Sequence, residues 1–272
     1  MRSAVTISLV PEARGGPFVF WEGLELGCEA AAELGFDAVE IFPPDARAID
    51  VAATRAMLAR SRLAVAAVAT GGGSVRYGLT LTHVHPDIRR AAREFIRRII
   101  DVAAEFEAPA IIGSMQGRHD AAVTLTEALA MLTEALEDLG EHASRRGLPL
   151  LFEPLNRYET NLFNRLGDTA EWFRTLHTRN IQILADLFHM NIEEADLAAA
   201  LRGAGPLIGH VHFADSNRRA VGFGHTAIAS VVAALRAIGY HGYLSAEVLP
   251  LPDSTTAGAQ TMIAFRAATI AP

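Results

Sequence analysis

The stretch that decides the fold is residues 108–153, APAIIGSMQGRHDAAVTLTEALAMLTEALEDLGEHASRRGLPLLFE. A short apolar run at 108–115 precedes a long segment at 125–146 whose apolar residues recur with helical spacing, and a second apolar run follows at 149–153. Runs that are apolar on both faces suit parallel strands covered by helices, and the helix between them supplies the long crossover that parallel strands need. The stretch therefore predicts one β-α-β unit.

The same strand-then-helix unit recurs along the whole chain. Eight such units in 272 residues fit a closed (β/α)8 TIM barrel better than an open doubly wound sheet. No Gly-x-Gly-x-x-Gly motif follows the first run, which further disfavours a dinucleotide-binding sheet. We therefore predict an α/β fold, a TIM barrel that residues 1–272 form as a single domain. The predicted strands are 4–10, 37–42, 63–70, 108–115, 149–153, 180–186, 207–213 and 242–248, and the predicted helices are 20–34, 48–61, 86–106, 125–146, 169–178, 192–203, 226–238 and 256–268.

Composition excludes several classes of protein. The formal net charge of −7 and the absence of a basic run argue against a nucleic-acid partner. No uncharged apolar stretch has membrane-spanning length, and Pro11 and Glu12 interrupt the N-terminal apolar run before it resembles a signal peptide. We expect a cytoplasmic protein without a membrane partner. Its single cysteine, Cys28, excludes an internal disulfide and is expected in the core.

Ionisable residues stand at the ends of four consecutive predicted strands. Active sites of barrels of this kind lie at the carboxyl ends of the strands, where side chains from several strands converge above the barrel axis. Three carboxylates and one imidazole form a mostly hard ligand set, which suits Mn²⁺ best and also Mg²⁺ or Co²⁺. We therefore predict one divalent metal site. Its ligands are Glu153, Asp186, His212 and Glu247.

Polar residues crowd the loops that follow these strand ends. A rim this polar suits a ligand rich in hydroxyl groups, such as a sugar or a polyol derivative. An exposed loop is also polar without any binding role, and for Asn156, Arg157, Asn161 and Arg219 the two interpretations stay open. The polar loop residues are Asn156, Arg157, Glu159 and Asn161 after the first strand end, His189 after the second, and Asp215, Ser216, Asn217 and Arg218 after the third.

These motifs resemble the xylose isomerase-like TIM barrel superfamily, and within it the ketose 3-epimerases that act on D-tagatose and D-psicose. The resemblance is carried by EPLNRYETN (153–161), ADLFHMNIEEAD (185–196), GHVHFADSNRR (209–219) and the strand that ends at Glu247, while the first half of the chain is similar only in fold. It implies the four metal ligands named above, with Glu153 and Glu247 also acting as the acid/base pair. It further implies a homodimer or homotetramer, and substrate contacts from Glu159, His189 and Arg218.

The reaction that the resemblance implies inverts the carbon next to a ketone. One glutamate removes a proton from one face and the other returns a proton to the opposite face, through a cis-enediolate that a divalent ion stabilises as a Lewis acid. Proton transfer on one face, between carbons 1 and 2, would make the same site an aldose-ketose isomerase. A dehydratase of the inosose or dehydroshikimate type would use the same proton abstraction to expel a hydroxyl group.

Other features of the first half bear on these alternatives. AAELGFDAVEIFPP (31–44) is similar to hydroxypyruvate isomerases, and its Glu40 could reach the site, although we expect a structural hydrogen-bonding role. The loops after the first and fourth strands carry Phe18, Met115 and Gln116, without the tyrosine or tryptophan typical of sugar epimerases. An apurinic endonuclease would need further histidine ligands and a basic groove, and a silent sugar-binding protein would need no carboxylate on each face of its ligand.

Overall fold

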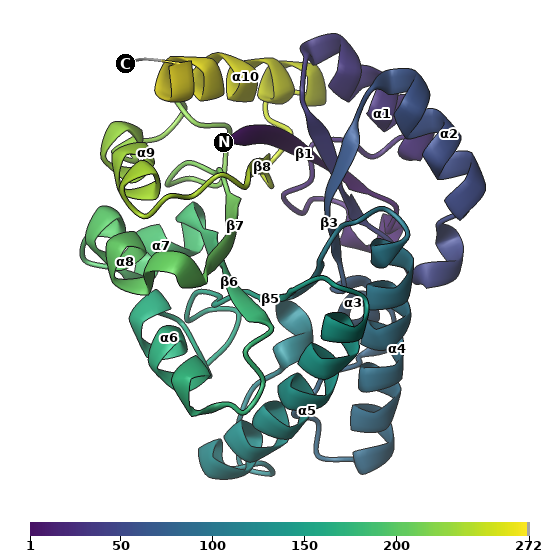
Figure 1. Ribbon diagram of the computed structural model, residues 1–272, viewed down its shortest axis with the longest axis vertical. Coiled ribbons are helices and arrows are strands. Elements are labelled where there is room, and N and C mark those ends of the chain that lie inside the picture. Colours follow the sequence, from purple (N-terminus) through teal and green to yellow (C-terminus); the bar gives the residue numbers. More distant parts are fainter. Residues whose placement is uncertain (271–272) are drawn as a thin grey trace.

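The computed structural model describes residues 1–270 and forms a closed barrel of eight parallel strands (Figure 1). Each strand pairs with the next along the chain, and β8 pairs with β1 to close the ring. The predicted TIM barrel is therefore confirmed. The strands are β1 (Arg2–Ser8), β2 (Ala38–Phe42), β3 (Ala64–Ala69), β4 (Ala110–Ile112), β5 (Leu150–Phe152), β6 (Ile181–Asp186), β7 (Ile208–His212) and β8 (Tyr243–Ala246).

A layer of helices surrounds the barrel, as Figure 1 shows. The largest apolar cluster lies between the two layers, with Leu150 and Phe152 of β5 in it, whereas Leu151 belongs to a second cluster. This alternation places Leu151 inside the barrel, because successive strand residues point to opposite faces. The helices are α1 (Leu24–Leu34), α2 (Val51–Ser61), α3 (Gly72–Tyr77), α4 (Pro86–Ala104), α5 (Leu125–Arg145), α6 (Leu166–Thr175), α7 (Leu187–Glu193), α8 (Leu197–Ala204), α9 (Ile228–Ala237) and α10 (Ser254–Ile270).

Helix α5 shows how local sequence sets these boundaries. Its first turn is closed by a capping box, in which Thr124 Oγ1 accepts from Glu127 N and the Glu127 carboxylate accepts from Thr124 N. The residues that α5 buries recur every three or four positions, among them Leu132, Leu136 and Leu139. One face of α5 therefore covers the barrel while the opposite face meets solvent.

The helical prediction is wrong at two places, both close to the mouth of the barrel. Helix α3 lies in a stretch that was expected to be a polar loop, and the stretch ADLFHMN contains the start of α7, so His189 lies on a helix instead of a loop. The single helix expected at 192–203 is divided between the end of α7 and α8. Both unpredicted helices are seven residues or shorter, a length at which hydrophobic periodicity is weak.

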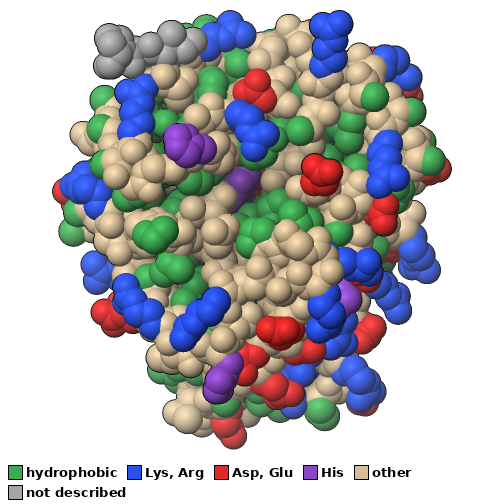
Figure 2. All heavy atoms as spheres, in the orientation of Figure 1, with side chains coloured by type: hydrophobic (Ala, Val, Ile, Leu, Met, Phe, Trp, Pro, Cys, Tyr) green, Lys and Arg blue, Asp and Glu red, His purple; other side chains and the backbone are tan. Residues whose placement is uncertain are grey.

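Three further observations concern membrane crossing, surface charge and Cys28. Among residues 1–270, no helix combines the length and the apolar character that crossing a membrane requires. The face drawn in Figure 2 carries basic and acidic side chains interspersed around its rim. Cys28 is buried in the core, as predicted.

Candidate metal centre and substrate cavity

The four predicted metal ligands meet at the carboxyl end of the barrel. Asp186 and His212 are the last residues of β6 and β7, while Glu153 and Glu247 come directly after β5 and β8. One ligand atom from each residue lies within 4.8 Å of those from the other three. His212 Nδ1 is 3.1 Å from Asp186 Oδ2, 3.3 Å from Glu153 Oε1 and 3.4 Å from Glu247 Oε2.

Asp186 serves the fold and the cluster with different oxygens. Its Oδ1 accepts from the backbone N–H groups of Phe188 (2.8 Å) and His189 (3.3 Å), which caps the amino end of α7. Its Oδ2 faces His212 and Arg218. The cap therefore fixes the direction of the carboxylate, and the second oxygen stays available to a cation.

The charges of the cluster match a divalent cation. Among residues 1–270, Arg218 is the guanidinium that contacts these carboxylates: its Nη1 donates to Asp186 Oδ2 (2.7 Å) and its Nη2 donates to Glu247. Three ionised carboxylates against one guanidinium leave two negative charges when His212 is neutral. Burying such an excess is costly without a further positive charge.

The pKa values of the cluster residues reflect their burial and the short distances between their charges. Burial, opposed in part by His212, raises the pKa of Glu153 to about 8. Burial alone would also raise the pKa of Asp186, but the adjacent Arg218 holds it well below its ordinary value. Burial lowers the pKa of His212, but the surrounding carboxylates raise it by more, so that it lies well above its ordinary value. The cluster therefore retains protons that a bound cation would displace.

Two observations on Glu153 fit a metal ligand. Its Oε1 is buried and makes no hydrogen bond with any group of residues 1–270. Its Oε2 lies against Gly113, where a Cβ atom would stand 2.5 Å away, so only glycine leaves space for the carboxylate there. An unpartnered buried carboxylate oxygen in a set of hard donors is what a divalent metal site requires.

The three predicted substrate-binding residues also lie at this mouth. Glu159, His189 and Arg218 line one cavity of about 250 Å³ together with Glu153 and Glu247. The backbone N–H of Asn156 donates to His189 Nδ1 (3.3 Å), so that this nitrogen accepts and the ring proton is carried by Nε2. His189 Nε2 faces the cluster, 3.8 Å from Glu153 Oε1. It can therefore donate to a ligand oxygen.

The cavity has two chemically different sides. The side formed by β5–β8 and their loops carries the ionisable residues, among them His212 and Arg218. The opposite side, from β1–β4 and their loops, is largely apolar and includes Phe18, Phe42 and Ile111. Met115 and Gln116, from the loop after the fourth strand, are fully buried and do not line the cavity. The site therefore offers a polar and an apolar wall to one small ligand.

Several polar loop residues build the rim without facing the cavity. The Asp215 carboxylate accepts from four backbone N–H groups between Ser216 and Thr226, which closes the loop that carries Arg218. Asn161 exchanges two hydrogen bonds with the backbone of His119, and Arg157 forms an ion pair with Glu193 at 2.9 Å. For Arg157 and Asn161 the structure thus supports the structural alternative.

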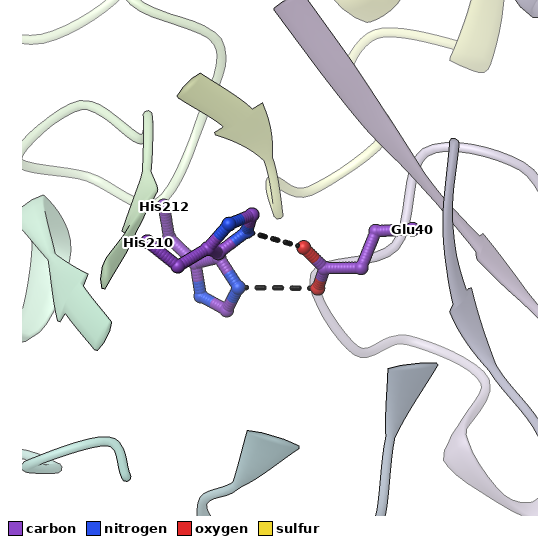
Figure 3. Close-up of side chains that lie close together, drawn as sticks. All are labelled: Glu40, His210 and His212. Carbon is purple, nitrogen blue, oxygen red and sulfur yellow. Dashed lines mark hydrogen bonds and ion pairs between the residues drawn. The ribbon is translucent and has the colours of Figure 1, made fainter. Parts of the chain in front are cut away.

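His210 is a buried residue beside the cluster that was not predicted to belong to the site. Figure 3 shows Glu40 of β2 pointing across the barrel toward His210 and His212 of β7. Glu40 Oε2 is 2.8 Å from His210 Nε2, and Glu40 Oε1 is 3.1 Å from His212 Nε2. The expected hydrogen-bonding role of Glu40 is confirmed, whereas His210 was not considered. The two-residue spacing of His210 and His212 was the available signal, since it puts both side chains on one face of a strand.

Comparison with known proteins agrees with this architecture. A family model described as "Xylose isomerase-like TIM barrel" matches residues 28–265. The chain belongs to the xylose isomerase-like TIM barrel family. Within the family, it is 30% identical over 242 residues to an L-ribulose 3-epimerase of a Methylomonas species, covering 86% of this chain and 83% of the relative. It is 28% identical over 234 residues to a D-psicose 3-epimerase of Agrobacterium fabrum, covering 85% of this chain and 78% of the relative.

A solved structure of the family extends the comparison. The 3-keto-D-glucoside 4-epimerase of Escherichia coli superimposes with a TM-score of 0.80 at 25% identity, covering 97% of this chain and 98% of that chain. By its name, this enzyme inverts carbon 4 instead of carbon 3, and its substrate is a glycoside instead of a free ketose. These three relatives are therefore named as sugar epimerases that invert carbon 3 or carbon 4.

Proposed function

We propose that this protein is a ketose 3-epimerase that depends on a divalent metal ion, with Mn²⁺ as the preferred ion. The observation that carries the proposal is the placement of Glu153 and Glu247 in one cluster and one cavity. They come from β5 and β8, the outer two of the four strands that supply the cluster, and so they flank Asp186 and His212. A ligand above the cluster would have a carboxylate on either side.

The four cluster residues would hold the ion, which supplies Lewis-acid stabilisation of negative charge on the substrate's carbonyl and neighbouring oxygens. Glu153 and Glu247 then exchange protons with carbon 3, one removing a proton from one face and the other returning a proton to the opposite face. His189 donates from Nε2 to a substrate oxygen, and Arg218 and Glu159 orient the hydroxyl groups next to the ketone. The apolar wall excludes water from the carbanion-like transition state.

The identities of the homologues support this assignment. Relatives named as 3-epimerases of D-psicose and L-ribulose match more than four fifths of this chain at 28 to 30% identity. Aldose-ketose isomerisation and dehydration use the same proton abstraction and are the outcomes that a test must separate. An apurinic endonuclease is disfavoured because β3 and β4 end in Ala69 and Ile112, without the histidine ligands that such an enzyme would need.

A second candidate is the 4-epimerisation of a keto-glycoside. A further cavity of about 340 Å³ adjoins the first, and the two share Ser114 and Glu159 in their linings. Its lining is largely polar and includes Thr80, Thr82 and Asp120. A space of this size and polarity beside the catalytic cavity could take the second unit of a glycoside, which a free ketose would leave unused.

The test is a substrate panel with the Mn²⁺-loaded enzyme. D-fructose, D-tagatose, L-ribulose and a 3-keto-glucoside are incubated separately, and the products are identified by NMR spectroscopy and chromatography. We expect carbon-3 epimers of at least one free ketose. Aldose products would indicate an isomerase, and loss of water with a new ultraviolet absorption would indicate a dehydratase. Turnover of the keto-glycoside alone would favour the second candidate.

A further inference from the structure

The strongest unassigned feature is the buried cluster of Glu40, His210 and His212 beneath the metal centre. In barrels of this kind, apolar side chains ordinarily fill the interior layers. Here a carboxylate that is 2% exposed and a histidine that is 1% exposed occupy the interior instead. Neither Glu40 nor His210 lines the cavity, so neither can touch a substrate. A buried charge is costly, and a structural role alone would be served as well by apolar residues.

The backbone on both sides of the barrel is adapted to this cluster. The pairing of β2 with β3 shifts register between Val39 and Glu40, and the pairing of β6 with β7 shifts so that Leu184 pairs with His210 and Gly209 is passed over. A Cβ atom on Gly209 would lie 2.7 Å from the Cβ atom of Gln182 and 2.9 Å from a methyl carbon of Leu151, so glycine permits the close approach of β7 to its neighbours at this position. Register shifts of this kind redirect side chains near active sites.

The geometry of the cluster determines which ring nitrogen of His212 would keep its proton when a cation binds. An ionised carboxylate only accepts hydrogen bonds, so both imidazoles must donate from Nε2, one to each oxygen of Glu40. The two rings are perpendicular, at 86°, which lets both reach a single carboxylate (Figure 3). His212 Nδ1 faces the ionised carboxylate of Asp186 at 3.1 Å, so in the metal-free cluster it carries a proton as well. A bound cation would displace that proton, which leaves a neutral imidazole that is protonated on Nε2 and has its lone pair on Nδ1. That atom faces Glu153, Asp186 and Glu247.

We propose that Glu40 is a positioning residue for the metal centre: it holds His212 in the Nε2–H tautomer and in the ring orientation that presents the Nδ1 lone pair to the cation. His210 supports this role of Glu40. Its Nε2–H donates a hydrogen bond to the second oxygen of Glu40, which prevents the carboxylate from rotating away from His212. The inference rests on the metal site in the proposed function, although not on the identity of the sugar. Carboxylates that hold the second nitrogen of a histidine ligand typically change metal affinity tenfold to a hundredfold when they are replaced.

The first measurement is the affinity of the metal-stripped protein for Mn²⁺, from the electron paramagnetic resonance signal of free Mn²⁺ during titration. Glu40→Gln keeps the shape of the side chain but removes its charge, and we expect its Kd to rise by about tenfold to a hundredfold. Glu193→Gln is the matched control, since Glu193 is a nearly buried glutamate that pairs with Arg157 on the protein rim. The control should bind Mn²⁺ as the wild type does.

The second measurement separates positioning from a purely structural role. In protein with ¹⁵N-labelled histidine and bound Mg²⁺, a diamagnetic ion, NMR spectroscopy should find His212 protonated on Nε2 in the wild type. In Glu40→Gln at the same Mg²⁺ concentration, a share of His212 should no longer bind the ion and should carry a proton on Nδ1, while the melting temperature stays the same or rises because a buried charge is gone. A lower melting temperature with unchanged Mn²⁺ affinity and unchanged tautomer would overturn the inference.

A second pair of variants keeps the inference testable if Glu40→Gln does not fold. His210→Gln retains an N–H donor for Glu40, whereas His210→Leu removes it, so only the leucine variant should bind Mn²⁺ more weakly. Equal affinities in these two variants would contradict the inference. Failure of the wild-type protein to bind Mn²⁺ would instead contradict the metal site itself, and with it the proposed function.

Discussion

The two halves of the barrel contribute differently to one cavity. Strands β5–β8 end in or directly before Glu153, Asp186, His212 and Glu247, so this half supplies every residue of the candidate metal centre. Strands β1–β4 end near Phe42, Ala69 and Ile112 and supply an apolar wall, with Glu40 as their one contribution to the chemistry of the centre. We call the half formed by β5–β8 the reactive side and the half formed by β1–β4 the shaping side. Substitutions on the two sides should have different consequences for catalysis.

The largest effect should follow removal of the metal ion. Treatment with EDTA should abolish activity, because the β5–β8 side then lacks the Lewis acid that stabilises negative charge on the substrate. Added Mn²⁺ or Co²⁺ should restore turnover better than Ca²⁺, whose larger coordination shell fits four protein ligands poorly. Activity assays with elemental analysis check this. Full turnover by protein without detectable metal would show that the reactive side works differently.

The next largest effect should come from the two glutamates that flank the cluster. Glu153→Gln and Glu247→Gln each keep an oxygen for the ion but cannot take up a proton, so kcat should fall by at least about a hundredfold. Metal content and circular dichroism should show that the variants fold and retain some metal. In deuterated water, a variant that still binds substrate can exchange the substrate proton from its surviving side without inversion. Near wild-type epimerisation by Glu247→Gln would rule out the acid/base pair.

A smaller effect is expected for the guanidinium on the same side. Arg218→Ala should lower kcat/KM by about tenfold, equivalent to about 1.4 kcal/mol, because a group that orients the substrate is lost. Its metal content should not fall, since Arg218 is itself a cation that repels the metal ion instead of binding it. Arg219→Ala is the matched control: this neighbouring arginine lies over the ring of Phe223, 4.6 Å from its centroid, and should not affect kinetics. Loss of bound metal in Arg218→Ala would assign the residue to the metal centre instead.

The smallest effect should come from the shaping side. Phe18 lines the cavity and packs on Phe42 with ring centroids 4.3 Å apart. Phe18→Leu keeps an apolar surface but loses the ring face, so KM should rise by about fivefold, roughly 1 kcal/mol, with kcat within about twofold of the wild type. Steady-state kinetics on the preferred sugar measure both constants. A large fall in kcat would mean that the apolar wall takes part in the chemistry.

The reactive side was also the more predictable side. Glu153, Asp186, His212 and Glu247 each end an apolar run, and the parallel topology implies that residues in such positions converge. Helix α7 was not predicted, because its amino-terminal cap is Asp186, which the sequence pattern indicated only as a metal ligand. The role of Asn161 was equally hidden, since its partner is the backbone of His119, in a loop 42 positions earlier in the chain that only the folded barrel brings close. The partners of Asp215 lie within its own loop, but their arrangement depends on backbone turns that the hydrophobic pattern does not reveal.

The cluster of Glu40 and His210 shows a different limit of prediction. Its members are 170 positions apart in the chain, and only closure of the barrel places β2 opposite β7. The sequence suggested that Glu40 could reach the site, but its partners depend on two register shifts that no hydrophobic pattern reveals. The interior of the barrel, where β2 and β7 approach each other, was therefore the least predictable part of the molecule.

The most direct test of the account is the position at which substrate hydrogen is exchanged. The Mn²⁺-loaded enzyme is incubated in deuterated water with the ketose that it turns over, and NMR spectroscopy locates the deuterium in substrate and product. The account predicts deuterium at carbon 3 of both epimers and none at carbon 1, because Glu153 and Glu247 exchange protons with carbon 3. Deuterium at carbon 1 or carbon 4, or inversion without any deuterium, would contradict it.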